Sequence, residues 1–123
     1  MSVPVLLDDL KARLDEFGSV AFLVTTNDDQ SSHVVSAVVE IDGDALVVPV
    51  GRTTRANASR RPTVSVLWPP DPGGAFSLIV DGTATTSADD GPLHVIPKGA
   101  ILHRMAGRTD EGPTCLPVSQ PAV

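Results

Sequence analysis

A chain of 123 residues is the size of one domain that buries a core of its own, and its single cysteine, Cys115, has no internal partner. Nine Lys and Arg against fifteen Asp and Glu give a net charge of −6, which argues against binding nucleic acid through a broad basic face. No apolar run approaches the roughly 20 residues of a membrane span, and the N-terminus carries Asp8 and Asp9 where a signal peptide would be basic. We therefore expect a cytoplasmic protein with no membrane or nucleic-acid partner.

The first half of the chain predicts one helix followed by three strands. Leucines at helical spacing, with Gly18 as a stop, predict an amphipathic helix over residues 4–17. β-branched runs predict strands over residues 20–26, 33–41 and 45–50. Turn clusters separate these runs, so we expect the three strands to form an antiparallel meander.

The second half predicts one short helix and several more strands. The helix is expected over residues 54–60, with Thr53 or Thr54 as its N-cap and Pro62 ending it. Strands are expected over residues 63–68, 75–87 with a bend near Gly82, 93–95 and 100–103. Pro97-Lys98-Gly99 is expected to interrupt the last two.

Six or seven short strands with only two helices predict a mainly β fold, a small antiparallel barrel with an N-terminal helix and one short helix. We assign residues 1–106 to this domain and residues 107–123 to a Gly- and Pro-rich tail without a core of its own. Several strands carry apolar residues on both faces, as at Val34-Val35, Val38-Val39 and Val47-Val48. Their outer face must therefore also be covered, by a helix or by another subunit.

The segment 45–61 carries a positive net charge in a chain that is acidic overall. It holds four of the nine cations, Arg52, Arg55, Arg60 and Arg61, and no carboxylate. Its corner Gly51-Arg52-Thr53-Thr54 opens the short helix, where unpaired N–H groups and the helix dipole favour an anion. These residues predict a phosphate site, with an Arg-rich solvated helix as the alternative.

Three fragments, in this order and spacing, resemble the pyridoxamine 5'-phosphate oxidase-like, FMN-binding split β-barrel family. They are the corner that runs from Gly51 to Asn57, the stretch Arg61-Pro62-Thr63-Val64-Ser65-Val66, and Ile79-Val80-Asp81-Gly82-Thr83-Ala84. The likeness covers about residues 20–104. It implies a six- or seven-stranded split barrel and a homodimer with a flavin at each end of the shared interface.

The resemblance also implies where the flavin lies. Its phosphate maps onto Arg52, Thr53, Thr54 and Arg55. Its ring maps onto Ser36, Ala37 and Val38 of the second strand, with Pro49 and Val50 as the floor. Trp68 either packs against the ring or belongs to the core or an interface.

The cation register is open, because the family has a Lys three residues before the helical Asn, whereas Arg55 precedes Asn57 by two. Either Arg52 or Arg55 then meets the phosphate. No catalytic residue is assigned, because flavin chemistry belongs mainly to the cofactor. His33, His94 and His103 lack metal-ligand spacing, so no metal site is expected.

The resemblance implies an oxidoreductase acting on a small organic molecule with FMN. Relatives that use a 5-deazaflavin with an anionic tail keep that cofactor open as an alternative, although the dispersed cations and acidic total favour FMN. A non-catalytic barrel that binds a ligand or heme is a further alternative.

Overall fold

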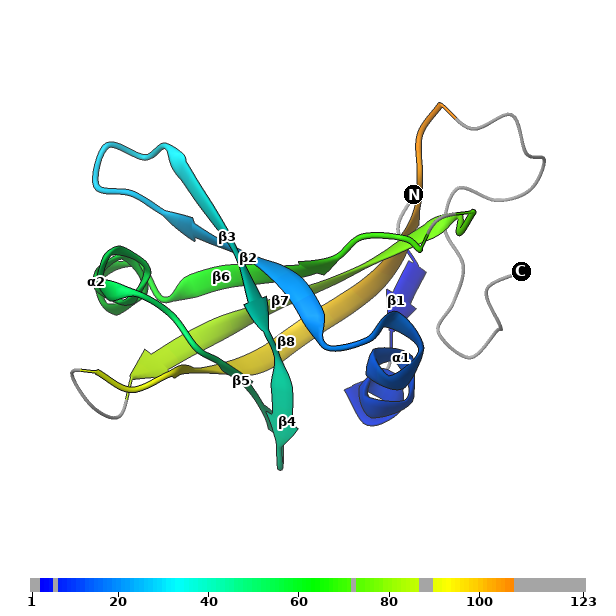
Figure 1. Ribbon diagram of the computed structural model, residues 1–123, viewed down its shortest axis with the longest axis horizontal. Helices are drawn as coiled ribbons and strands as arrows, with labels where there is room; N and C mark the ends of the chain where they lie inside the picture. Colours follow the sequence, from blue (N-terminus) through cyan, green and yellow to red (C-terminus); the bar gives the residue numbers. More distant parts are fainter. Residues whose placement is uncertain (1–2, 6, 72, 87–89, 108–123) are drawn as a thin grey trace.

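The structure, a computed structural model, describes residues 3–5, 7–71, 73–86 and 90–107 (Figure 1). Residues 108–123 of the expected tail, Cys115 included, lie outside the described residues. None of the helices within the described ranges is long and apolar enough to cross a bilayer.

One curled antiparallel sheet makes up most of the domain, which confirms the mainly β prediction. Seven strands follow the order β3-β2-β6-β7-β8-β5-β4, and β1 pairs with β8 beside this path. The strands are β1 (Val3–Val5), β2 (Val20–Thr26), β3 (Ser32–Val38), β4 (Glu40–Asp42), β5 (Ala45–Val48), β6 (Thr63–Trp68), β7 (Phe76–Thr86) and β8 (Leu93–Arg104). The helices are α1 (Leu10–Phe17) and α2 (Arg52–Arg60), with a 3-10 turn η1 (Leu7–Asp9) before α1.

The core lies inside the curl of the sheet. Alternate residues of β2, β6 and β7 are buried, as the period of two requires, and Val66, Leu78 and Val80 are fully enclosed. Leu102 of β8 joins them. Aliphatic side chains dominate this core, as expected from a chain with few aromatic residues.

The strand expected over residues 33–41 is split at Val39, whose N–H donates to the carbonyl of Ser19 at 2.7 Å. Before the break β3 pairs with β2, and after it β4 pairs with β5. The predicted meander is therefore present in altered form. The first half of its middle strand, β3, pairs with β2, and the second half, β4, pairs with β5. This bend connects the two ends of the strand order.

The predicted helix over 4–17 was wrong at its start. Val3–Val5 forms β1, which pairs with residues 100–102 of β8, and α1 begins only at Leu10. Strand pairing with residues almost a hundred positions later in the chain therefore outweighs the local preference of these residues for a helix. The stop at Gly18 is confirmed, since this residue has φ 86° and its N–H donates to the carbonyl of Leu14.

The interruption expected at Pro97-Lys98-Gly99 was also wrong, because β8 runs unbroken through it. Asp81 pairs with Gly99 while Gly82 pairs with Pro97, so Lys98 is the extra residue of a β-bulge. The predicted bend at Gly82 is confirmed by this irregularity. A Cβ on Gly82 would lie 2.6 Å from the carbonyl oxygen of Ile96, so only glycine fits there.

The short helix begins at Arg52, two residues before its predicted start. Gly51 is its N-cap in an extended conformation, and no side chain caps the helix, so the expected Thr53 or Thr54 cap was wrong. Arg61 leaves the helical region before Pro62, as predicted. In Figure 1, α2 lies beneath the turn that joins β2 to β3, at the end of the sheet away from α1.

Candidate functional site

A groove of about 470 Å³ lies between β3 and the start of α2. It brings together six of the residues predicted to bind a cofactor: Ser36, Pro49, Val50, Arg52, Thr53 and Thr54. Three further residues complete its lining: His33, Val35 and Gly51. Among the described residues that line it, one is an arginine and none carries a carboxylate.

The start of α2 presents backbone donors to this groove. The first bond of the helix runs from the N–H of Arg55 to the carbonyl of Gly51 at 3.1 Å. The N–H groups of Arg52, Thr53 and Thr54 therefore have no partner within the helix. Because the N-cap is glycine, no side chain satisfies them either. Such a helix start attracts an anion.

The two candidate arginines have different roles. The guanidinium of Arg55 donates to the carbonyls of Val50 at 3.0 Å and Gly91 at 3.1 Å, so it braces the backbone around the helix. Arg52 is exposed and lines the groove. Within the described ranges its side chain makes no hydrogen bond or ion pair. The structure thus leaves Arg52 as the cation available to a ligand.

A histidine that the sequence analysis did not place in the site lines the same groove. Nε2 of His33 is 3.1 Å from Oγ1 of Thr54, a hydrogen bond between the first residues of β3 and the first turn of α2. Thr54 is 3% exposed. The sequence offered one signal, the position of His33 next to the turn cluster that precedes its strand.

Strand β3 has a free edge beside the groove. Among the described residues β3 pairs only with β2, so backbone groups on its other edge are open to a ligand. Ser36 reaches the groove, whereas Ala37 packs against the core and Val38 is exposed. Neither Ala37 nor Val38 has a side chain in the groove lining.

Trp68 lies in the core. Its side chain is 1% exposed, and its indole Nε1–H donates to the carbonyl of Gly18 at 3.0 Å. Of the two alternatives for Trp68, the structure therefore supports the core. The indole contributes nothing to the groove lining.

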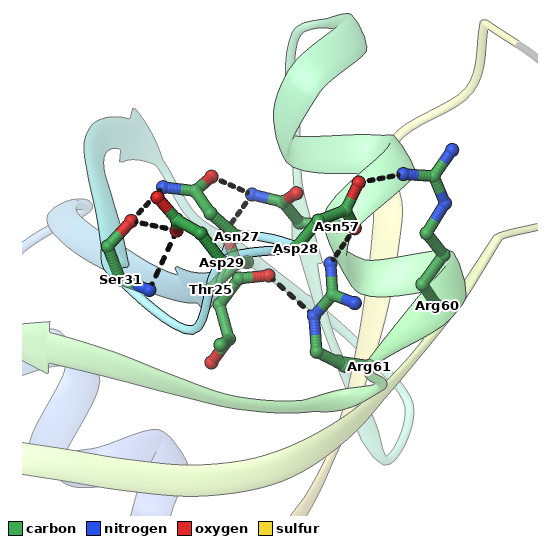
Figure 2. A network of polar contacts seen from close by, with 9 residues as sticks. Thr25, Asn27, Asp28, Asp29, Ser31, Asn57, Arg60 and Arg61 are labelled. Atoms are coloured by element: carbon green, nitrogen blue, oxygen red, sulfur yellow. Dashed lines mark hydrogen bonds and ion pairs between the residues drawn. The ribbon is translucent and has the colours of Figure 1, made fainter.

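A polar network fixes α2 against the turn between β2 and β3 (Figure 2). The buried Asn57 donates to Oδ1 of Asn27 at 2.8 Å and to Oγ1 of Thr25 at 3.3 Å. Arg60 and Arg61 each donate to Asp28 at 2.6 Å. These contacts tie α2 to β2 and to the turn that leads into β3, which holds α2 in place relative to β3.

The carboxylates of this turn remain ionised at neutral pH. Hydrogen bonds from Arg61 and then Arg60 hold the pKa of Asp28 below its usual 3.8. Hydrogen bonds from the hydroxyl and N–H of Ser31 lower the pKa of Asp29 in the same way. Both charges lie along a neighbouring hollow of about 550 Å³, which also includes Arg52 and Arg60.

Another hollow, of about 490 Å³, lies between η1, the β4–β5 hairpin and β8. It is lined mainly by apolar residues, with Asp8, Lys11 and Asp44 at its rim. None of the predicted site residues lies there. Among the described residues no group of three or more His, Cys, Asp and Glu could hold a metal ion.

The outer face of β2 and β3 carries exposed apolar side chains. Val20 is paired with Val38, and the two are 59% and 50% exposed. Phe22 and Val34 are exposed on the same face. A contiguous apolar face of this kind on a small domain is typical of an interaction surface.

Two curated proteins, one from Mycobacterium bovis and one from Mycobacterium tuberculosis, are each 37% identical to this chain. The matches cover 81% of this chain and 80% of each relative, and both relatives are uncharacterized. The chain belongs to their family. No protein-family model matches it.

Comparison with solved structures identifies the fold. A Listeria innocua protein, provisionally named a pyridoxamine 5'-phosphate oxidase, matches with a TM-score of 0.64 and 19% identity, over 78% of this chain and 96% of its own. An FAD-binding protein from Mesorhizobium loti matches with a TM-score of 0.63 and 15% identity, over 85% and 98%. The chain has the pyridoxamine 5'-phosphate oxidase-like split-barrel fold.

Proteins that bind a different cofactor share this fold. The heme storage protein of Vibrio cholerae matches with a TM-score of 0.61 and 15% identity, over 77% of this chain and 96% of its own. At such low identity the likeness describes the fold alone. The cofactor of this split barrel must therefore be inferred from its own residues.

Proposed function

We propose that this split barrel is a flavin-dependent oxidoreductase that binds FMN in the groove between β3 and α2 and acts on a small organic molecule. One observation carries the proposal: the groove combines the open start of α2 with the unengaged cation Arg52 and the free edge of β3. These are the parts that a phosphate and a flat heteroaromatic ring require.

The phosphate end of FMN fits the donors at the start of α2. Three backbone N–H groups without helical partners, the Thr53 hydroxyl and the Arg52 guanidinium supply hydrogen bonds and positive charge. None of the described lining residues is a carboxylate that would oppose a dianion.

The ring end fits the strand beside it. Open backbone groups of β3 near Ser36 can pair with the polar edge of the ring, and Pro49 and Val50 form an apolar floor. When bound, the flavin supplies the electron-transfer chemistry. The residues of this chain hold it, orient it and shield one side from water.

The apolar face of β2 and β3 supports a homodimer. Four large apolar side chains exposed on one face, Val20, Phe22, Val34 and Val38, are costly to leave in water. Ser36 lies on the same strand face and also reaches the groove, so a second subunit on this face would border the flavin site.

The charges beside the groove favour FMN over a deazaflavin with an anionic tail. Among the described residues, the hollow next to the groove has two cations, Arg52 and Arg60, and two carboxylates, Asp28 and Asp29, so it lacks the net positive charge that such a tail requires.

The absorbance spectrum of purified protein tests the proposal, with the released cofactor identified by mass after denaturation. We expect a flavin spectrum and the mass of FMN. A Soret band would favour the heme-binding alternative. Protein that remains colourless after incubation with FMN and desalting would contradict the flavin proposal.

A further inference from the structure

His33 and Thr54 form a hydrogen-bonded pair in the lining of the groove, beside the start of α2. Nε2 of His33 and Oγ1 of Thr54 are 3.1 Å apart, and both residues line the groove with Arg52. Thr54 is buried and belongs to the first turn of α2, where the backbone donors converge. Any anion held there lies within the reach of this pair.

The direction of the hydrogen bond depends on the tautomer and on the charge of His33. A neutral imidazole can accept a hydrogen bond from the threonine hydroxyl, which then directs its hydrogen toward the histidine. An imidazolium can only donate. The hydroxyl of Thr54 then accepts from His33, and its own hydrogen is free to point into the groove.

We propose that His33 is an anion-binding residue of this groove, and that the groove takes up a proton on His33 when it binds an anion such as a phosphate or sulfate group. Protonation adds a positive charge beside Arg52 and fixes His33 as the donor to Thr54, which leaves the Thr54 hydroxyl free to donate to the anion. The anion in turn stabilises the imidazolium. The link to FMN rests on the proposed function, because there the anion is the flavin phosphate.

Among the described residues, no other group that lines the groove with His33 or pairs with it on β2 changes charge in the same pH range. Opposite it on β2 lies the neutral Thr25, α2 contributes Thr54, and the remaining charge in the groove is Arg52, which stays protonated. The nearby carboxylates of Asp28 and Asp29 face the other hollow and have lowered pKa values. Histidine is the side chain that titrates between pH 5 and 8.

Sulfate is the probe that tests this proposal, because its charge is constant over that range, whereas a phosphomonoester titrates near pH 6. Sulfate is titrated into the full chain and followed by the amide resonances of Thr53 and Thr54. We expect binding about tenfold tighter at about pH 5.5 than at about pH 8, because a charged donor bonds an anion more strongly than a neutral one.

The variant His33→Gln tests the effect of the positive charge on His33 separately from the effect of its hydrogen bond to Thr54. Its side-chain amide can still donate to Thr54, but it carries no proton to gain, so its sulfate affinity should be equal at both pH values. His94→Gln, on β8 and outside the groove lining, is the matched control and should keep the wild-type dependence. Equal sulfate affinities at both pH values in the wild type, or the same change in His33→Gln, would overturn the proposal.

FMN distinguishes this proposal from the proposed function. If sulfate binding depends on His33 but FMN does not bind, the anion site stands and the flavin assignment fails. If FMN binds and sulfate affinity is independent of pH, the flavin assignment stands and the role of His33 is refuted.

Discussion

The guanidinium of Arg55 donates to the carbonyl of Val50 across the start of α2, at 3.0 Å. Its Nε–H donates to the carbonyl of Gly91, which lies 36 residues later in the chain. Arg55 therefore joins the corner before α2 to the segment that leads into β8. Because Arg55 is engaged in this way, we expect Arg52 to be the residue that meets a ligand.

Arg55→Ala should lower stability. The change leaves two backbone carbonyls without their charged donor, and each such hydrogen bond contributes about 1 to 3 kcal/mol. Urea unfolding should show a loss in this range. Arg60→Ala is the control, because Arg60 and its partner Asp28 are largely exposed and such pairs contribute little to stability. An unfolding curve of Arg55→Ala that matches the wild type would refute the bracing role.

Gly82→Ala should destabilise the barrel. The added methyl group would lie 2.6 Å from the carbonyl oxygen of Ile96 and 2.7 Å from Cγ1 of Val95, so β7 and β8 must separate at the bulge. We expect a loss of about 1 to 3 kcal/mol, typical of overpacking. Gly99→Ala, on the opposite strand, meets nothing within 4 Å and should have little effect. Equal melting temperatures for the two variants would show that the bulge accommodates the methyl group, and would contradict the prediction.

Phe22→Glu should convert the proposed homodimer to monomer. It places a charge at the centre of the exposed face formed by β2 and β3, where a permanent interface of this kind buries more than about 2,000 Å². Light scattering measures the mass. Leu7→Glu, an exposed apolar position on η1, is the control and should remain dimeric. A wild type that is monomeric at micromolar concentration refutes the dimer itself.

Asp28→Asn should remove part of the pH dependence of stability. The folded pKa of Asp28 lies below its ordinary value of 3.8 because Arg61 and Arg60 bond the carboxylate. A carboxylate whose pKa is lowered on folding stabilises the fold at pH values above its unfolded pKa. This stabilisation is lost as the pH falls through the folded pKa. Wild type should therefore melt above Asp28→Asn at neutral pH, and the difference should shrink below pH 3.8. A difference that persists unchanged in acid would point to another cause.

Much of the fold is predictable from local sequence. The strands β2 and β6 match their predicted ranges because β-branched runs there are bounded by turn residues. The errors at β1, Val39 and Pro97 have a common origin. In each case a partner distant in sequence, such as β8 for β1, determines the conformation.

The site was predictable in its location but not in its details. The Gly-Arg-Thr-Thr corner indicated the start of α2, which lines the groove as expected. Which arginine remains available depends on the carbonyl of Gly91, and the entry of His33 into the groove depends on its pairing with Thr54. No spacing within the sequence encodes these contacts.

The most direct test of the flavin assignment compares FMN with riboflavin, which lacks the phosphate, by fluorescence titration of the wild type and Arg52→Ala. The wild type should bind FMN more tightly than riboflavin. Arg52→Ala should weaken FMN by about 30-fold or more, corresponding to at least about 2 kcal/mol, and leave riboflavin nearly unchanged. Arg60→Ala should behave like the wild type. A wild type that prefers riboflavin, or an Arg52→Ala variant with unchanged FMN affinity, would contradict the assignment of the groove as a flavin phosphate site.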